Sequence, residues 1–193
     1  MDWFLIVANI LSLVGNLLFT LSSIFKSKRK IVLFQSSNYV LAVISEYMTK
    51  AYSGMIQEGM SLIRNIILLF VKSEKKIIKL IITLICVLIA VSVGIYINYE
   101  YSDNVWYGYL PVLGTVVYST AVILAFMLNV NEIKCELIIK IGLTINCFIW
   151  MTYGFFVKLY PILIFNIITV ILCIISFVRI AIIVKENKKL AAE

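Results

Sequence analysis

The sequence predicts an all-α integral membrane protein with seven transmembrane helices. Of its 193 residues, 63% are hydrophobic and 14% are charged, and the mean hydropathy is +1.05. Soluble domains are nearer half apolar and a quarter charged. Seven apolar stretches of about 18 to 25 residues follow one another, each long enough to cross roughly 30 Å of hydrocarbon. Short polar loops separate them, so no soluble domain of useful size remains.

The seven predicted spans follow these stretches along the chain. The first stretch is too long for the apolar core of a signal peptide, and its basic cluster follows it instead of preceding it, so we expect an uncleaved helix. The two prolines, Pro111 and Pro161, stand at predicted helix starts, where proline is well tolerated. The spans are predicted at residues 3–25, 31–50, 54–71, 77–97, 111–129, 137–154 and 160–184.

Lysine and arginine are distributed unequally between the two sides of the predicted membrane. The side of the N-terminus has only Lys50 and Lys158, and its loop at 98–110 combines acidic residues with an aromatic belt. Because cytoplasmic loops are enriched in Lys and Arg, we predict that the N-terminus lies outside and the C-terminus in the cytoplasm. The other side collects Lys26, Lys28, Arg29, Lys30, Lys72, Lys75, Lys76, Lys79, Lys134, Lys140, Arg179, Lys185, Lys188 and Lys189.

Several function classes are disfavoured by the composition. The chain has no histidine, which removes imidazole acid–base catalysis and histidine metal sites. Its cysteines have no CxxC spacing, so we expect neither a zinc site nor a disulfide framework; they are Cys86, Cys135, Cys147 and Cys173. No HExxH, DxxD or phosphate-binding glycine motif is present. We therefore predict that the protein is not an enzyme, holds no cofactor or metal, and binds no nucleic acid.

Polar side chains fall on one face of most predicted helices, at spacings that match 3.6 residues per turn. Such side chains need partners in hydrocarbon, so these faces are expected to line the interior. The span at 77–97 has few polar residues and is expected to be peripheral. For serine and threonine the alternative of simple helix-to-helix contact remains open. The stripes are Asn9, Ser12, Asn16, Thr20 and Ser23; Gln35, Asn38, Ala42, Glu46 and Thr49; Gln57, Glu58, Ser61, Arg64 and Asn65; Asn146, Trp150 and Tyr153; and Asn166, Thr169, Cys173 and Ser176.

Arg64 lies about ten residues into its predicted helix, roughly 15 Å at 1.5 Å per residue and near the membrane centre. An arginine at that depth costs about 2.5 to 3.5 kcal/mol on insertion scales, so it needs a partner. Glu58 points about 120° away on the same helix, and we therefore expect Glu46 to be the partner. The pair would be either a packing element or a charged wall of a solute pocket.

The order of features in the first three spans is repeated in the last three. Gly15 and Gly114, Met48 and Met151, and Asn65 and Asn166 are separated by 99, 103 and 101 residues. Three helices followed by an odd linker helix and three more give two parallel bundles, a 3+1+3 plan. The predicted units are a first three-helix bundle at 1–73, a linker helix with its outer loop at 74–109, a second bundle at 110–186 and a cytoplasmic tail at 187–193.

Short motifs resemble a known family. The segment LPVLGTVV at 110–117, the Trp150 region and the segment FVR at 177–179 resemble the YgjV-like family of bacterial inner-membrane proteins, over most of the chain. The 3+1+3 plan is similar to the wider SWEET, PQ-loop and nicotinamide-riboside-transporter group. That resemblance implies a translocation path between two bundles, with Asn65 and Asn166 in contact with solute and Trp150 as an aromatic wall. The chain lacks the Pro-Gln dipeptide and the paired tryptophans of those relatives, so neither sugar nor nicotinamide riboside is indicated.

These observations favour a carrier, most simply a facilitator with alternating access, for a small polar organic solute such as a sugar, nucleoside or vitamin-like metabolite. Asn65, Asn166, Asn38 and Asn146 would hydrogen-bond the solute, and Trp150 and Tyr153 would stack on it. Arg64 and Glu46 would orient it, and Glu46 or Glu58 would serve any proton coupling. A non-transporting receptor or assembly partner is the alternative. The expected partners are the solute, the lipid bilayer and, as an open alternative, a second copy of the chain in a homo-oligomer.

Overall fold

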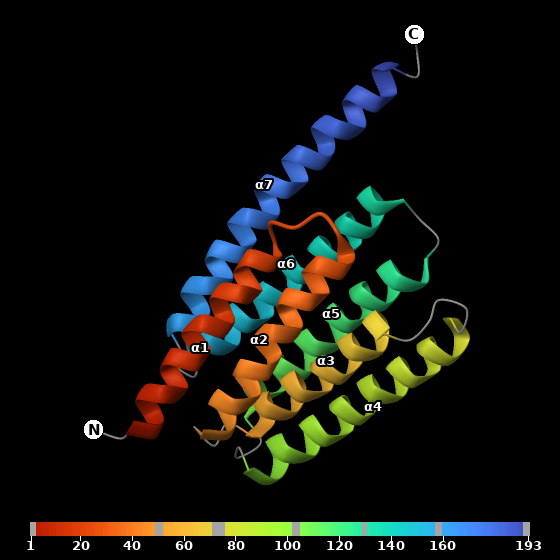
Figure 1. The fold of residues 1–193 in the computed structure, drawn as a ribbon. Helices are drawn as coiled ribbons and strands as arrows, with labels where there is room; N and C mark the ends of the chain where they lie inside the picture. The colour runs from red at the N-terminus through yellow and green to blue at the C-terminus, as the bar shows by residue number, and fades with distance from the viewer. Residues whose placement is uncertain are drawn as a thin grey trace.

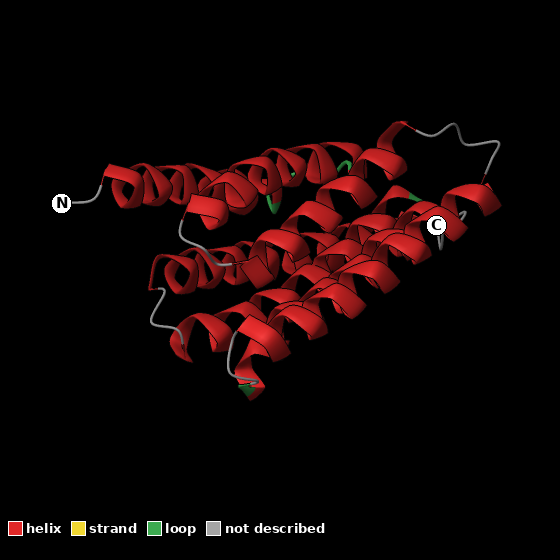
Figure 2. Ribbon diagram, turned by 90° about the horizontal axis from the view of Figure 1, so that it is seen from below, coloured by secondary structure: helices red, strands yellow, loops and turns green. Residues whose placement is uncertain are grey.

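The computed structural model describes residues 3–48, 52–70, 76–101, 105–128, 131–156 and 160–190, and within them it is helical with no strand (Figures 1 and 2). The predicted all-α class is confirmed. Features predicted at Lys50, Val71, Asn129 and Lys158 and the unit boundary at 73–74 lie outside the described residues. The elements are α1 (Trp3–Ser22), α2 (Lys28–Met48), α3 (Tyr52–Phe70), α4 (Lys76–Tyr101), η2 (Trp106–Tyr109), α5 (Leu110–Met127), α6 (Glu132–Phe156) and α7 (Tyr160–Leu190).

The starts of two helices have the local chemistry expected of a helix N-terminus. Pro111 occupies the first turn of α5, where its missing N–H needs no partner. Before α6, the side-chain oxygen of Asn131 accepts the backbone N–H of Lys134 at 3.0 Å, which caps the helix. Four segments in the described part are long and apolar enough to cross a membrane: Leu80–Glu100, Trp106–Met127, Glu132–Phe156 and Pro161–Glu186, with a shorter apolar helix at Ile6–Ser22.

The helices pack as two sequential groups with cross-contacts between them. α1 packs on α2 and α2 on α3, while α5 packs on α6 and α6 on α7. Between the groups, α1 contacts α7, α3 contacts α5, and α2 contacts α6. If α1, α2 and α3 are exchanged with α5, α6 and α7 respectively, the contact of α1 with α7 becomes that of α5 with α3. The contact of α2 with α6 is unchanged by the exchange. α4 lies at one side of the molecule against α3 and α5 (Figure 1).

Two similar glycine contacts give an alignment between the two groups. Gly15 of α1 lies against the side chain of Asn38 in α2, and Gly114 of α5 lies against the side chain of Asn146 in α6. Asn38 and Asn146 are separated by 108 residues, and we call the alignment that this interval defines the repeat register. The interval is longer than the offsets of the residue pairs that predicted the repeat.

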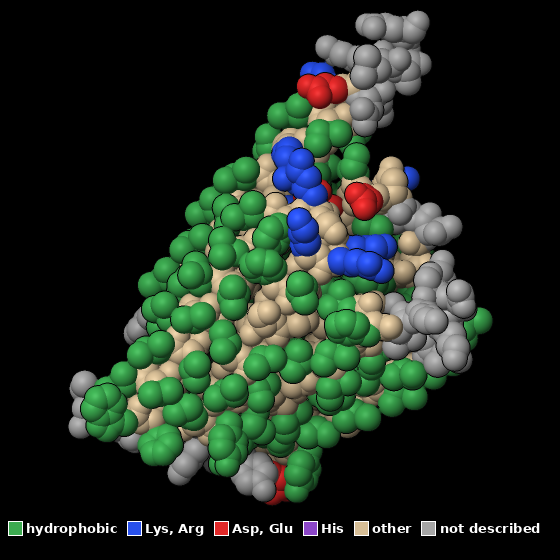
Figure 3. Space-filling model, viewed as in Figure 1, with side chains coloured by type: hydrophobic (Ala, Val, Ile, Leu, Met, Phe, Trp, Pro, Cys, Tyr) green, Lys and Arg blue, Asp and Glu red, His purple; other side chains and the backbone are tan. Residues whose placement is uncertain are grey.

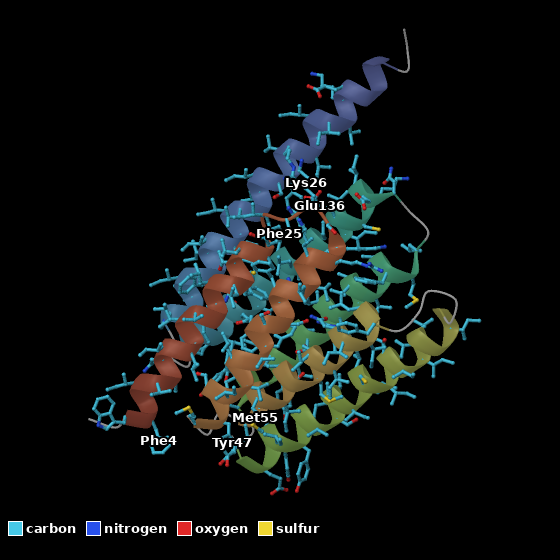
Figure 4. All side chains as sticks on the ribbon, in the orientation of Figure 1. Phe4, Phe25, Lys26, Tyr47, Met55 and Glu136 are labelled. Carbon is cyan, nitrogen blue, oxygen red and sulfur yellow. The ribbon has the colours of Figure 1, made fainter. Side chains whose placement is uncertain are left out.

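The two ends of the helix assembly differ in chemistry. Phe4, Tyr47 and Met55 mark the end at which α1 begins, here called the N-terminal end, and Lys26 and Glu136 lie toward the opposite end, called the basic end (Figure 4). On the visible face, Lys and Arg gather toward the basic end while hydrophobic side chains cover most of the remainder (Figure 3). The apolar core lies toward the basic end too, since it includes the start of α2, the end of α5 and the start of α6.

The contact between α5 and α6 gives the first prediction. A Cβ added to Gly142 would overlap the Cβ of Ala121, which no rotamer change can move away. Gly142→Ala should therefore separate the two helices and cost about 1 to 3 kcal/mol of stability, measured as a lower unfolding temperature of the detergent-purified protein.

Gly59→Ala is the matched control, because its added Cβ would meet only Val43 within 4 Å, at 3.9 Å. Alanine in a helix interior is favoured over glycine by about 0.5 to 1 kcal/mol, so this variant should be at least as stable as the parent. An unfolding temperature for Gly142→Ala equal to that of Gly59→Ala would show that the described α5–α6 contact is wrong.

Candidate functional site

A cavity of about 150 Å³ lies in the half of the molecule toward the N-terminal end. Side chains of α1, α2, α3, α5, α6 and α7 line it, and no described residue of α4 does. Six helices therefore converge on one space, the five for which polar stripes were identified in the sequence and α5, for which none was. Of the predicted site residues, the structure brings seven together around this cavity: Asn38, Glu46, Glu58, Asn146, Trp150, Tyr153 and Asn166.

Asn38 and Asn146 occupy matching places on the two sides of the cavity. Each is 6% exposed, and each rests against a glycine of the preceding helix in its group. A Cβ at Gly15 would lie 2.8 Å from Oδ1 of Asn38, and a Cβ at Gly114 would lie 2.7 Å from Oδ1 of Asn146. The two glycines thus make room for the two amides at the cavity wall.

The amides of Asn38 and Asn146 have no hydrogen-bond partner among the residues that the structure describes. Buried polar groups are nearly always satisfied by protein, water or ligand. An amide buried in a membrane protein and left open to a cavity therefore indicates that the cavity holds water or a polar solute. In contrast, Asn166 already donates to the carbonyl oxygen of Ile162 at 2.8 Å.

The two groups of helices contribute different chemistry to the cavity wall. The first group provides the carboxylates of Glu46 and Glu58, whose matching positions in the repeat register are Gly154 and Asn166. The second group provides Trp150 and Tyr153, whose rings meet edge to face with centroids 5.6 Å apart. Their matching positions in the first group are the small residues Ala42 and Ser45. One wall is acidic and the opposite wall is aromatic.

Arg64 does not line the cavity, and its partners differ from the prediction. It is 1% exposed and donates to Oδ1 of Asn65 at 3.0 Å and 2.8 Å, to Oγ of Ser119 at 2.5 Å and to the Tyr39 hydroxyl at 3.5 Å. Glu46 instead faces Gly54, where an added Cβ would lie 2.5 Å from its carboxylate. Because α2 and α3 run antiparallel, this register leaves Arg64 about ten residues, or roughly 15 Å, away from the level of Glu46.

Asn65 also lies outside the cavity. It accepts hydrogen bonds from Arg64, and its amide nitrogen donates to Ser36 Oγ at 3.3 Å and to the carbonyl oxygen of Val32 at 3.4 Å. The repeat register explains the difference from Asn166, because Asn166 corresponds to Glu58 and not to Asn65. Asn65 is therefore about two turns nearer to the basic end than Asn166.

A network of polar contacts around Arg64 lies beside the cavity, and we call it the Arg64 layer. The apolar core also reaches the cavity, because Phe19, Tyr39 and Tyr118 belong to both. The Tyr118 hydroxyl donates to Gln35, whose amide donates to Ser22 Oγ at 3.2 Å. The guanidinium carbon of Arg64 lies 5.4 Å from the centroid of the Tyr118 ring. With Asn65 and Ser119, these side chains bridge α1, α2, α3 and α5.

Sequence reasoning missed a second buried charge cluster, between α6 and α7. Glu136 forms ion pairs with Lys140, at 2.8 Å, and with Arg179, and Lys140 also donates to Ser176 Oγ at 2.6 Å. Lys140 is fully buried, although the charge count placed it with the loop lysines. The signal that could have found it is the i,i+4 spacing of Glu136 and Lys140, about two turns inside an apolar helix.

Among the described residues, the structure shows neither a metal-binding cluster nor a disulfide bond. No group of three or more Asp, Glu, Cys or His side chains there could hold a metal ion. All four cysteines are free thiols in buried positions.

The Arg64 layer generates the second prediction. Arg64→Met removes hydrogen bonds to three side chains, and at roughly 0.6 kcal/mol for each bond in a membrane protein the loss should be about 2 kcal/mol. The unfolding temperature in detergent should fall by about 4 °C or more. Arg64→Lys should recover only part of it, because an ammonium lacks the planar fork that reaches Asn65 and Ser119 together.

Arg29→Met, at an exposed position of α2, controls for the loss of one positive charge and should leave the unfolding temperature unchanged. Equal stability of Arg64→Met and Arg29→Met would rule out a structural role for the layer.

One comparison with known proteins identifies a family. The family model for Imp-YgjV, described as a bacterial inner membrane protein, matches residues 6–182. Neither the curated proteins nor the solved structures contain a significant match to the chain. The family description and the apolar helices together indicate an integral inner-membrane location. The chain therefore belongs to the Imp-YgjV family of bacterial inner membrane proteins.

Proposed function

We propose that this protein is a membrane carrier that moves a small polar organic solute between the two sides of the inner membrane. The observation that carries the proposal is the pair of buried asparagines, Asn38 and Asn146, whose amides face the cavity without a partner among the described residues. They lie at matching positions of the two helix groups, so a solute between them would touch both groups at once. Binding at such an interface couples the solute to relative movement of the groups.

The arrangement of the helices supports a 3+1+3 plan with two parallel bundles. The contacts between the groups are related by exchange of α1 to α3 with α5 to α7, and α4 lies to one side and adds no described residue to the cavity. A solute path between the bundles therefore meets six helices and bypasses the linker.

The Arg64 layer favours a carrier with alternating access rather than a protein with a continuous pore. Its contacts cross from one bundle to the other: Tyr118 of α5 donates to Gln35 of α2, and Arg64 of α3 donates to Ser119 of α5. With these bonds intact, the two bundles are joined on the side of the cavity toward the basic end. Opening that side would break a small number of polar contacts and would expose side chains that water can satisfy, which keeps the free-energy difference between the states small.

The distribution of basic residues supports an orientation with the N-terminal end outside and the basic end in the cytoplasm. In that orientation the cavity lies in the outer half of the membrane, and the Arg64 layer lies between it and the cytoplasm. The lining residues suit binding without covalent chemistry, so we propose a carrier and not an enzyme.

Uptake into proteoliposomes tests the proposal. A panel of radiolabelled monosaccharides, nucleosides, vitamins, amino acids and amines should include a solute whose flux saturates and is accelerated by the same unlabelled solute preloaded inside. Such counterflow is expected of a carrier and not of a pore. Asn38→Ala and Asn146→Ala should each lower that flux by about tenfold, the effect of losing roughly 1.4 kcal/mol of binding.

Ser37→Ala is the matched control, because Ser37 neighbours Asn38 on the exposed face of α2. Its flux should equal that of the parent. Specific solute binding with no flux in the same vesicles would contradict the carrier and favour the receptor alternative. Equal flux in Asn146→Ala and Ser37→Ala would contradict the site.

A further inference from the structure

The cavity wall is acidic in the described part of the chain. Its described lining includes Glu46 and Glu58 and no Lys or Arg. Arg64, behind the wall, donates its hydrogen bonds to Asn65, Ser119 and Tyr39. Acidic side chains that face a cavity in a membrane protein mark solute or ion pathways. A cavity lined by one sign of charge attracts solutes of the opposite sign, so the lining favours a positively charged occupant.

A glycine of α3 makes room for one carboxylate of the acidic wall. The carboxylate of Glu46 lies where a side chain at Gly54 would otherwise stand, 2.5 Å from an added Cβ. Glu46 also acts electrostatically on Tyr153 of the other bundle, so the acidic wall and the aromatic wall are close enough to contact one small molecule together. The other aromatic neighbours, Tyr39 and Tyr118, close the cavity toward the core.

The aromatic wall suits a cation as well. Trp and Tyr rings attract ammonium groups over their faces, by about 0.5 to 2 kcal/mol or more as water is excluded. Trp150 and Tyr153 meet at right angles, with an interplanar angle of 90°, so together they offer an edge and a face to the same solute. Carbon atoms of the solute would pack on these rings while the charge faces the carboxylates.

Two further observations define the occupant. Asn38 and Asn146, both buried and open to the cavity, provide a donor and an acceptor each for a polar group of the solute. The volume of about 150 Å³ is that of an engineered cavity that admits benzene. A solute of that size is much smaller than a nucleoside.

We propose that the solute of this cavity is a small organic cation, an amine or quaternary ammonium compound, whose nitrogen lies against Glu46 and Glu58 and whose carbon atoms pack on Trp150 and Tyr153. The proposal rests on the carrier function proposed above, because it names the solute class of the same cavity. Binding and flux are therefore measured separately.

The experiment compares cations with neutral molecules of the same shape. Choline is paired with 3,3-dimethyl-1-butanol, and butylamine with 1-butanol, as probes of the full chain in detergent. At least one cation should raise the unfolding temperature in a saturable manner, because ligand binding to the folded state stabilises it by mass action. Its neutral partner should not. Glu58→Gln and Glu46→Gln should each weaken cation binding by about tenfold, the loss of one charged hydrogen bond.

Glu100→Gln is the matched control, since Glu100 is an exposed carboxylate on α4 outside the cavity, and it should bind the cation as the parent does. Trp150→Phe keeps an aromatic face and should retain more affinity than Trp150→Leu. Unfolding temperatures without ligand separate a binding defect from a folding defect, because glutamine has nearly the same shape as glutamate. Equal binding of choline and 3,3-dimethyl-1-butanol, or unchanged cation binding in both Glu46→Gln and Glu58→Gln, would overturn the cation proposal.

The same probes in proteoliposomes distinguish this proposal from the carrier function. Cation binding without counterflow supports the cation site and overturns the carrier. Uptake of a neutral solute that is driven by a proton gradient and unaffected by excess choline and butylamine supports the carrier and overturns the cation site. In that case the carboxylates would hold the coupling proton instead of the solute.

Discussion

A polar side chain within hydrocarbon must be satisfied by another part of the protein or by water, and this constraint governs how the chain is arranged. Ile, Leu and Phe side chains cover the outer faces of the helices, while Arg64, Gln35 and Lys140 are at most 1% exposed. The constraint is met differently in the two halves of the interior. Toward the basic end, polar groups bond to one another or give way to an apolar core. Toward the N-terminal end, Asn38 and Asn146 remain open to a cavity.

The two groups of helices are joined by contacts that suit a movable interface. Within lipid, apolar surfaces gain little by meeting each other, so packing and hydrogen bonds decide how strongly helices associate. Between the groups, Thr20 of α1 contacts Thr169 of α7 at 2.9 Å, and Ser119 of α5 contacts Arg64 of α3. Each of these two contacts is a hydrogen bond to a hydroxyl group, and water or another side chain can take the place of either partner. Within each group, polar contacts such as the ion pair of Glu136 with Arg179 are joined by close helix approach at glycines such as Gly15 and Gly142.

The sequence was sufficient for the helical class and for most of the cavity wall, because 3.6-residue periodicity directly reports which face of a helix is polar. The sequence did not predict at which level of the helix assembly each polar side chain lies. Arg64 and Asn65 are on the same helix as Glu58, yet they lie one to two turns beyond it and take part in the Arg64 layer. Their level depends on how far α3 is shifted along α2, which the sequence pattern does not specify. Lys140 was misplaced for a related reason: a count of basic residues at helix ends cannot tell a loop lysine from one that lies inside a helix opposite Glu136 and Ser176.

The unequal walls of the cavity have a consequence for how such a protein can be assembled. A homodimer of identical three-helix units would present each lining side chain twice across its symmetry axis. Glu46 and Glu58 would then give four carboxylates in a space of about 150 Å³, and their mutual repulsion would prevent most of them from ionising. A single chain removes this restriction, because its two helix groups have separate sequences and each can carry its own lining side chains. An acidic wall can face an aromatic wall only in a single chain or in a heterodimer.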